Sequence, residues 1–473
     1  MFIIDAMLAI SDFIWGWPIL ILTFGAGIIL SVKLKFFQFT KFGHAMKGTF
    51  GTIFEKSEGA TGDISPFQAC CTALASTLGV GNIAGVSVAI ASGGPGAIFW
   101  MWVTAVLCLI VKFCEIILGV AYREKDPETG MWRGGLYWDV VNGLGKKWKW
   151  FGILWALVLG IDMLFAPAVQ INTVVSSLNT VFTINPIIIG IFSAVLMAVV
   201  LIGGIKSISR FAELVVPFMA IAYTACSIYV LIRYAANIPG VLSNVVKCAF
   251  TPAAATGGFA GSTIMMAVRW GLARAVYSNE AGTGTAPLAH STAAVNHPVK
   301  QGLWGITEVF VDTIVVCSMT ALVVLCTGAW ESGSTGAALT SQAFGTAFGN
   351  TTAGGIFIAI IIVFFAFTTA VVNVFYSEVC LNLVFGKKII FPCRIAGCLM
   401  AIVGAVGALS TIWNLYDFFL GFCQIFNLIV CVVMIKKIVL LVNDYLKRLK
   451  DNKWEATSEE VTAQIPGLFA EDK

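Results

Sequence analysis

The chain reads Ala75-Ser76-Thr77-Leu78-Gly79-Val80-Gly81-Asn82-Ile83-Ala84-Gly85 in the middle of an apolar run over residues 67–91. A helix crosses a bilayer with about 20 apolar residues, so this run is long enough to span. Gly79 and Gly81 each cost a helix interior about 1 kcal/mol relative to alanine. A break there would free backbone N–H and C=O groups that need partners in hydrocarbon. The run therefore predicts a discontinuous membrane helix, with close helix packing through the glycines as the alternative.

The rest of the composition also indicates a membrane protein. Of the 473 residues, 58% are hydrophobic and 11% are charged, and the mean hydropathy is +0.90. A soluble domain carries about 25% charged residues. Continuous runs rich in Leu, Ile, Val and Phe indicate helices. We predict an all-α polytopic membrane protein with eleven transmembrane helices at about 14–32, 67–91, 97–121, 150–182, 186–203, 213–235, 262–289, 303–328, 354–382, 395–411 and 413–435.

The basic residues predict which side of the membrane each loop faces. Loops that alternate along the chain hold most of the Lys and Arg, at 33–56, 123–149, 206–210, 300, 387–394 and 436–453. By the positive-inside rule these loops are cytoplasmic. The N-terminus is then outside and the C-terminus inside, as an odd number of spans requires. The tail after Val442 is polar and is expected to form a short solvated helix or a disordered end.

A second glycine-interrupted span follows later in the chain. It reads Trp270-Gly271-Leu272-Ala273-Arg274-Ala275-Val276-Tyr277-Ser278-Asn279-Glu280-Ala281-Gly282-Thr283-Gly284. With the first span set aside, spans 2–6 and 7–11 form two units of five, and an odd number per unit gives them opposite orientations. The first span of each unit is interrupted. The chain could unwind near Gly271 or near Ser278–Gly284, and the sequence leaves both open.

The first break offers two kinds of backbone group. Free N–H groups from about Val80 onward suit a carboxylate. Carbonyls around Ala75 and Leu78 suit a small cation. Thr368 and Thr369 lie together in the middle of span 9 and can add oxygen ligands, although each hydroxyl could instead bond its own helix backbone. An amino acid with Na⁺ would satisfy both sets of groups.

Several of these segments resemble the alanine or glycine:cation symporter family, over nearly the whole chain. The segments that carry the likeness are Ser65-Pro66-Phe67-Gln68-Ala69, the run Gly79–Gly85, Gly93-Gly94-Pro95-Gly96, Arg133-Gly134-Gly135 and Ser278-Asn279-Glu280-Ala281-Gly282. The resemblance implies a bacterial or archaeal inner-membrane carrier that couples alanine or glycine uptake to Na⁺. It also implies a leucine-transporter-type fold of two inverted five-helix repeats after one extra helix.

The resemblance also assigns residues to roles. The sodium site would use carbonyls of Ala75, Leu78 and Phe365 with the hydroxyls of Thr368 and Thr369. Val80 and Gly81 would give N–H groups to the substrate carboxylate. Asn82 and the Thr77 carbonyl match a second sodium position of only some relatives, which we do not claim. The candidate substrate-binding residues are Thr77, Gly79, Val80, Gly81, Asn82, Gln170, Gly271, Tyr277, Ser278 and Asn279.

Polar residues inside other spans have open roles. Gln170 could contact substrate or form an interhelical hydrogen bond. Asp162 is a functional candidate as an ion or proton partner, or one half of a structural pair with an Arg. Glu280 could anchor the broken segment or contact an ammonium group. Lys112 and Glu115 are expected to pair with each other, while Glu308 and Asp312 share a helix face and need cations, for which Arg269 or Arg274 could serve.

We predict a sodium-coupled uptake system for a small neutral amino acid that works by alternating access. A proton-coupled symporter is the alternative, and a passive channel a more distant one. No enzyme activity and no organic cofactor are expected, and the partners are the amino acid, Na⁺ and membrane lipid, without nucleic acid. A monomer would be sufficient, although the sequence does not fix the oligomeric state. The expected parts are 1–65, the repeats 66–235 and 236–435, and the tail 436–473. The thirteen Cys show no pairing pattern and are expected to act as small buried hydrophobes.

Overall fold

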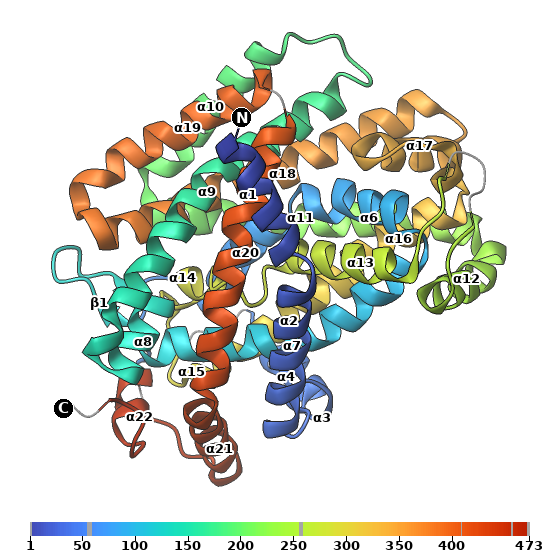
Figure 1. Ribbon diagram of the computed structural model, residues 1–473. Helices are drawn as coiled ribbons and strands as arrows, with labels where there is room; N and C mark the ends of the chain where they lie inside the picture. The colour runs from blue at the N-terminus through green and yellow to red at the C-terminus, as the bar shows by residue number, and fades with distance from the viewer. Residues whose placement is uncertain (1, 54–58, 255–258, 408, 456, 471–473) are drawn as a thin grey trace.

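The computed structural model describes residues 2–53, 59–254, 259–407, 409–455 and 457–470. Within these residues the chain is a bundle of helices with one hairpin of two short strands, β1 (Glu124–Lys125) and β2 (Trp132–Arg133) (Figure 1). The helices are α1 Phe2–Ile14, α2 Trp17–Lys33, α3 Phe37–Thr40, α4 Phe42–Phe50, α5 Pro66–Thr77, η1 Gly81–Gly85, α6 Val86–Gly93, α7 Gly96–Ala121, α8 Leu136–Leu144, η2 Lys146–Trp148, α9 Lys149–Leu178, α10 Pro186–Ile202, α11 Gly204–Arg233, η3 Ala235–Asn237, α12 Ile238–Phe250, α13 Ile264–Asn279, α14 Ala286–His290, α15 Pro298–Val309, η4 Phe310–Cys317, α16 Ser318–Cys326, η5 Ala329–Ser332, α17 Gly336–Phe348, α18 Thr351–Phe385, η6 Lys387–Ile389, α19 Ile390–Val406, α20 Leu409–Val433, α21 Ile435–Asp451 and α22 Ser458–Ala463.

The lengths and composition of these helices make the chain a multi-pass membrane protein. Among the described residues, eight helices are long and apolar enough to cross a bilayer, or nine if the bent pair α5 and η1–α6 counts as one span. The apolar helix α10 has 17 residues, and α13 has 16. Both are shorter than the eight, so the count of eleven stays a prediction. Large apolar side chains are exposed on α10 and α11, including Phe192, Ile202, Phe218 and Ile221, as expected for a surface that faces lipid.

The predicted break in span 2 is confirmed. Helix α5 begins at a capping box, in which Ser65 Oγ accepts from the Gln68 N–H and the Gln68 side chain accepts from the Ser65 N–H. It ends at Thr77, and the chain resumes as the π-helical turn η1 and α6, bent by 51° from α5. The glycines Gly79 and Gly81 flank the point where the helix stops. The span is therefore two half-helices joined inside the bundle.

The chain of span 7 unwinds near the second of the two predicted positions. Helix α13 ends at Asn279, and Glu280 takes a left-handed conformation with φ of 51°. Gly282 and Gly284 follow with φ of 91° and 85°, values that favour glycine. Gly271 instead lies inside α13, where an added Cβ would come within 2.3 Å of the Ala97 carbonyl oxygen of α7. Gly271 thus allows α13 to pack closely on α7.

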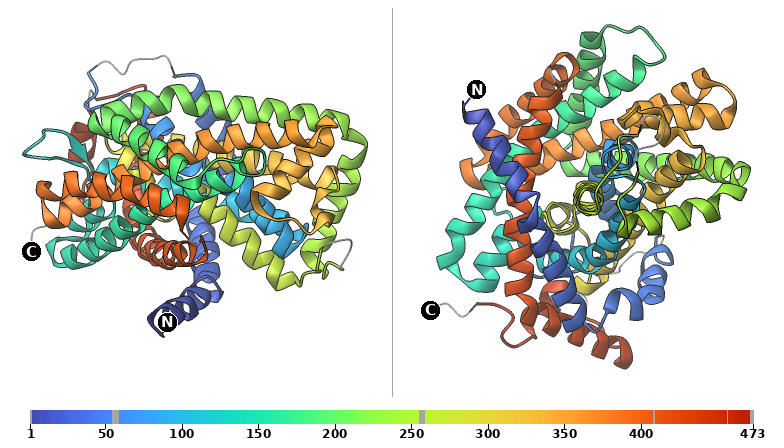
Figure 2. Two further views of the ribbon diagram at one scale, coloured as in Figure 1. Left: turned by 90° about the horizontal axis from the view of Figure 1, so that it is seen from above. Right: turned by 45° about the vertical axis from the view of Figure 1, so that its right-hand side comes forward.

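The two halves of the chain are interleaved in space. Helix α9 packs along α18, and α10 packs along α19. Helix α7 lies between α13 and α15. The N-terminal helices α1 and α2 run along the outside of the bundle against α20 (Figure 2). The thirteen cysteines form no disulfides, and most are buried among apolar side chains, as expected.

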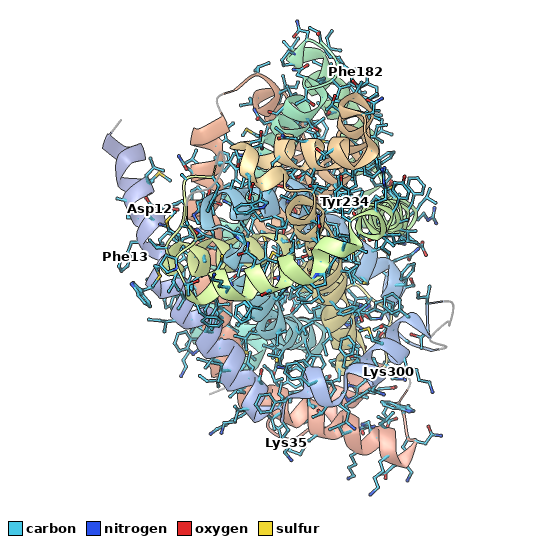
Figure 3. All side chains as sticks on the ribbon, turned by 90° about the vertical axis from the view of Figure 1, so that its right-hand side faces the viewer. Asp12, Phe13, Lys35, Phe182, Tyr234 and Lys300 are labelled. Atoms are coloured by element: carbon cyan, nitrogen blue, oxygen red, sulfur yellow. The ribbon has the colours of Figure 1, made fainter. Side chains whose placement is uncertain are left out.

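One end of the molecule gathers basic side chains and the C-terminal segment. Lys35 and Lys300 lie near this end, and Phe182 lies at the opposite end (Figure 3). Arg123, just beyond α7, is buried and donates to the carbonyls of Ser291 and Ala293. It also pairs with Glu459 of α22 at 2.9 Å. Burial lowers the pKa of the Arg123 guanidinium.

The prediction of a solvated C-terminal tail was wrong for the described residues. The side chains of Val461 and Leu468 are fully buried. The hydroxyl of Tyr122 donates to the Leu468 carbonyl at 2.7 Å, and Lys437 donates to the Gly143 carbonyl at 2.6 Å. The segment is mostly polar, but a few buried apolar side chains in it attach it to the bundle.

Candidate substrate and ion site

Five oxygen atoms meet where α5 ends against α18. Thr369 Oγ1 lies 2.9 Å from the Ala75 carbonyl, 3.4 Å from the Leu78 carbonyl and 3.0 Å from the Phe365 carbonyl. Thr368 Oγ1 lies 2.9 Å from the same Phe365 carbonyl. All five residues are buried. We call this group the oxygen cluster, and it consists of the five residues that the sequence predicted as sodium ligands.

The oxygen cluster holds more acceptors than protons. The Thr369 hydroxyl carries one hydrogen and faces three carbonyls, so it can donate to one of them at a time. Carbonyl and hydroxyl oxygens are ligands that hard cations prefer. Among the described residues, no group of three or more His, Cys, Asp or Glu side chains is placed to hold a metal ion. The oxygen cluster therefore consists of neutral oxygen atoms alone.

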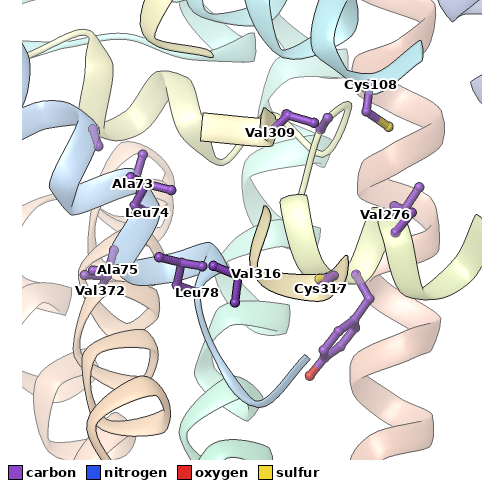
Figure 4. Packing of buried hydrophobic residues seen from close by; sticks show 14 of the residues in the cluster. Ala73, Leu74, Ala75, Leu78, Cys108, Val276, Val309, Val316, Cys317 and Val372 are labelled. Carbon is purple, nitrogen blue, oxygen red and sulfur yellow. The ribbon is translucent and has the colours of Figure 1, made fainter. Parts of the chain in front are cut away.

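The apolar packing around the break holds the cluster in place. Figure 4 shows Ala75 next to Val372 of α18, and Leu78 next to Val316 of η4. All four of these side chains are buried. Because α5 is packed tightly on both sides, its last carbonyls have a fixed direction toward α18.

Gly79 connects the oxygen cluster to Gln170 of α9. A Cβ at Gly79 would lie 2.7 Å from Thr369 Oγ1 and 3.3 Å from Gln170 Oε1. The Gln170 amide oxygen accepts a hydrogen bond from the Val80 N–H at 3.3 Å. An amide oxygen therefore occupies the position at which we predicted a carboxylate oxygen. Two roles were left open for Gln170, and the structure shows the interhelical hydrogen bond.

Tyr277 covers the outer side of the break. A Cβ at Gly81 would come within 2.9 Å of the Tyr277 ring. Tyr277 also stacks near Trp413 and Tyr416 of α20, with ring centroids 5.3 and 5.7 Å away. A cleft of about 310 Å³ ends on this ring and is lined by Leu8, Ser11, Asp12, Trp15, Arg269, Trp270, Ala273, Arg274, Tyr277, Asn414 and Asp417. The aromatic layer separates this cleft from the break.

Asn82 joins the break to two other helices. Its amide nitrogen donates to Ser278 Oγ at 2.8 Å and to Asp312 Oδ1 at 2.6 Å, and its Oδ1 accepts from the Gly79 N–H at 3.0 Å. Ser278 Oγ donates to Asp312 Oδ2 at 2.8 Å. Three candidate residues of the sequence, Gly79, Asn82 and Ser278, therefore share one buried hydrogen-bond network.

The predicted arginine partners of Glu308 and Asp312 were wrong. Arg269 pairs with Asp12 at 2.7 Å, and the Arg274 guanidinium lies over the rings of Trp270 and Tyr277. Asp312 is satisfied by amide and hydroxyl donors instead. Glu308 lies 3.9 Å from Lys112 Nζ and contacts His290 Nε2. The spacing of residues along a helix predicts which side chains share one face. It does not predict which other helix packs against that face.

The second break is closed by side chains of α7 and α20. Lys112 Nζ donates to the Asn279 carbonyl at 3.0 Å. Glu115 Oε2 accepts from the N–H groups of Gly282 and Gly284 at 3.1 and 3.3 Å, and from Asn427 Nδ2 at 2.6 Å. Lys112 and Glu115 are 3.8 Å apart, so the predicted pair is present. Both side chains of this pair also bind the unwound backbone, a role that the sequence did not predict.

The other candidates are divided between the two breaks. Thr77 is buried at the end of α5, beside the oxygen cluster. Asn279 donates to Thr313 Oγ1 and belongs to the second break. Glu280 accepts hydrogen bonds from the hydroxyls of Ser76 and Thr285. Two roles were left open for Glu280, and these bonds favour the one in which it anchors the broken segment. Gly271 lies in the α13–α7 contact, apart from both.

Comparison with known proteins identifies a matching family. A family model described as "Sodium:alanine symporter family" matches residues 1–459.

The chain belongs to the sodium:alanine symporter family.

Relatives in this family cover nearly the whole chain. An uncharacterized transporter of Bacillus subtilis, YflA, is 38% identical over 454 residues, which cover 94% of this chain and 95% of the relative. The sodium/alanine symporter AgcS of Methanococcus maripaludis is 38% identical over 89% of this chain and 92% of its own length. The probable sodium/glutamine symporter GlnT of Bacillus subtilis is 35% identical over 94% and 91%. The chain is therefore a transporter of this family and not an enzyme.

A solved structure shares the fold. The nucleobase-cation-symport-1 family transporter Mhp1, in a closed conformation with bromovinylhydantoin bound, matches with a TM-score of 0.50. The match covers 83% of this chain and 81% of Mhp1, at 14% sequence identity. It indicates that this member of the sodium:alanine symporter family and Mhp1 have a common arrangement of helices.

Proposed function

We propose that this protein takes up a small neutral amino acid, alanine or glycine, together with Na⁺ by alternating access. The observation that carries the proposal is the oxygen cluster, which lies directly beside the N–H groups of the first break. A zwitterion needs hydrogen-bond donors for its carboxylate, and Na⁺ needs oxygen ligands. The break supplies both kinds of group within one buried region.

In the proposed binding mode, Na⁺ binds to Ala75, Leu78, Phe365, Thr368 and Thr369. The substrate carboxylate takes the Val80 and Gly81 N–H groups and displaces the Gln170 amide oxygen, which already marks a carboxylate-like position. Tyr277 closes the pocket above Gly81. Gly79, Gly81 and this ring leave little room, which favours a small side chain. Thr77, Asn82, Ser278 and Asn279 would support the backbone around the pocket, and Gly271 would act through the packing of α13.

The proposed architecture places the pocket at the middle of the membrane. It has eleven spans in two inverted repeats, 66–235 and 236–435, after an N-terminal part, 1–65, and before the tail, 436–473. The N-terminus would be outside and the C-terminus cytoplasmic, in the inner membrane of a bacterium or archaeon. The ends of the described chain lie at opposite ends of the bundle (Figure 1), which supports an odd number of spans.

Uptake into proteoliposomes tests the proposal. Purified protein is reconstituted, and accumulation of [³H]-alanine and [³H]-glycine is followed with an inward Na⁺ gradient, with an inward proton gradient, and with neither. We expect accumulation above equilibrium with the Na⁺ gradient. Accumulation with only a proton gradient would favour the proton-coupled alternative, and equilibration without a gradient dependence would indicate a passive channel. Unlabelled glutamine serves as the larger competitor, and we expect it to compete more weakly than alanine.

A further inference from the structure

Asp162 of α9 is a buried carboxylate that the proposed site does not use. Its side chain is completely buried. Neither of its oxygens has a hydrogen-bond partner in the part of the chain that the structure describes. Buried carboxylates in membrane proteins normally pair with a cation or with several donors. This one needs a ligand that the protein itself does not supply.

The groups that face Asp162 increase this need. Glu280, at the end of α13, and Asp417, on α20, both repel its charge. Tyr277, Tyr416 and Cys423 are its other titratable neighbours. The nearby cation Arg274 interacts with Asp417 and lies against aromatic rings. Within the described residues, therefore, acidic and neutral groups surround Asp162.

Tyr277 is a neighbour of both the cleft and Asp162. Tyr277 lines the cleft on one side and interacts with Asp162 on the other. Its hydroxyl is buried and, like the carboxylate, has no partner among the described residues. Beyond Asp162 lies Glu280, which accepts from Ser76 Oγ at 3.1 Å near the end of α5. Asp162 is therefore a neighbour both of a residue that lines the cleft and of an acidic residue at the second break.

We propose that Asp162 is the anionic ligand of a second monovalent-cation site, for Na⁺ or a proton, with the Tyr277 hydroxyl as a neutral oxygen nearby. This inference rests on the proposed function, because the cation would be co-transported. The site is separate from the oxygen cluster. Asp162 precedes Gln170 by eight residues on α9, about 12 Å along the helix at 1.5 Å per residue. The carrier would then move two cations with each amino acid, one at each site.

The charge moved per amino acid tests this directly. Alanine is a neutral zwitterion, so the net charge carried with it equals the number of cations. Full-length protein is reconstituted into liposomes, the membrane potential is set with K⁺ and valinomycin, and the potential at which [³H]-alanine flux reverses gives the charge ratio. We expect a ratio of two for the wild type and one for Asp162→Asn. Asp162→Glu should restore two, and the matched change Glu331→Gln, at an exposed carboxylate, should leave it at two.

The two cation sources give different results in the same assay. If the second cation is Na⁺, the reversal potential follows the Na⁺ gradient equally in both proteins, but it shifts half as steeply with the alanine gradient in the wild type as in Asp162→Asn. If it is a proton, the wild-type reversal potential responds to both the Na⁺ and the pH gradients, and the variant loses the pH response and follows the Na⁺ gradient twice as steeply. A wild-type ratio of one overturns the proposal even if the variant does not fold. So does a ratio of two that Asp162→Asn leaves unchanged.

Failure of the proposed function would look different. In that case wild-type alanine flux would not respond to the Na⁺ gradient, and Thr369→Ala would leave the flux unchanged. A Na⁺ response in the wild type that is weakened by Thr369→Ala, together with a charge ratio of one, supports the function and overturns only the second site.

Discussion

The two interrupted spans differ in the groups that surround their breaks. At the second break, Lys112 and Glu115 bond the freed backbone groups at 3.0 to 3.3 Å, and Asn427 donates to Glu115. At the first, three carbonyls share one threonine proton, and a glutamine oxygen contacts an N–H group at 3.3 Å. A broken membrane helix is therefore not by itself a binding site. We call the first break open, because Thr369 faces more carbonyls than it can donate to at one time, and the second closed, because side chains hold its backbone.

The largest effect should come from opening the closed break. Glu115→Gln removes the charge that faces buried Lys112 and replaces an acceptor with an amide. Loss of one partner of a buried ion pair costs about 3–5 kcal/mol. We expect a large fall in melting temperature in detergent, with or without alanine and Na⁺. Glu124→Gln, in the partly exposed hairpin, is the control. An unchanged melting temperature for Glu115→Gln would show that the second break does not depend on this network.

Filling the open break should abolish transport while the fold survives. Gly81→Leu directs a side chain into the Tyr277 ring, which a Cβ alone would approach to 2.9 Å. We expect loss of [³H]-alanine binding to purified protein. Gly85→Ala is the matched control, since its Cβ would meet Arg274 at an ordinary 3.6 Å. Binding by Gly81→Leu at the wild-type level would move the substrate away from the break.

Removal of one oxygen from the oxygen cluster should weaken the binding of Na⁺ and leave the amino acid pocket unchanged. Thr369→Ala deletes the hydroxyl that faces three carbonyls. We expect the Na⁺ concentration for half-maximal uptake to rise at least about tenfold, or ~1.4 kcal/mol. Thr369→Ser should stay close to wild type. Thr173→Ala, whose hydroxyl bonds the Val169 carbonyl of its own helix, is the control. If Thr173→Ala and Thr369→Ala shift the Na⁺ dependence equally, the cluster is not the ion site.

The smallest effect is expected in an experiment that compares the two breaks within one molecule. Hydrogen exchange is followed by mass spectrometry with and without Na⁺ and alanine. Ligands should slow exchange in peptides that contain Val80 and Gly81, because their N–H groups gain a carboxylate. Peptides that contain Gly282 and Gly284 should change little, since Glu115 already binds these N–H groups. Equal protection at the two breaks would contradict the contrast drawn between them.

The sequence predicted features that depend on neighbouring residues. Glycines in an apolar run predicted the first break, and adjacent threonines predicted the oxygen cluster. It could not predict contacts that need several helices in register. The binding of Lys112 and Glu115 to the unwound segment joins helices far apart in the chain, and the pairing of His290 with Glu308 depends on how two successive helices pack. The prediction that the C-terminal tail is solvated was wrong because a few buried apolar side chains, such as Leu468, hardly change the average polarity of the segment.

The burial of the thiols makes this carrier convenient for accessibility mapping. Membrane-impermeant maleimides need a thiol that water reaches, and most of the native cysteines are buried inside the bundle. A single cysteine placed in a loop, for example at Ser334 or Thr129, would then react over a low background. Labelling from outside intact cells or from inside-out vesicles would assign each loop to a compartment. The topology could thus be mapped with cysteines added to the wild-type chain, without prior removal of the native thiols.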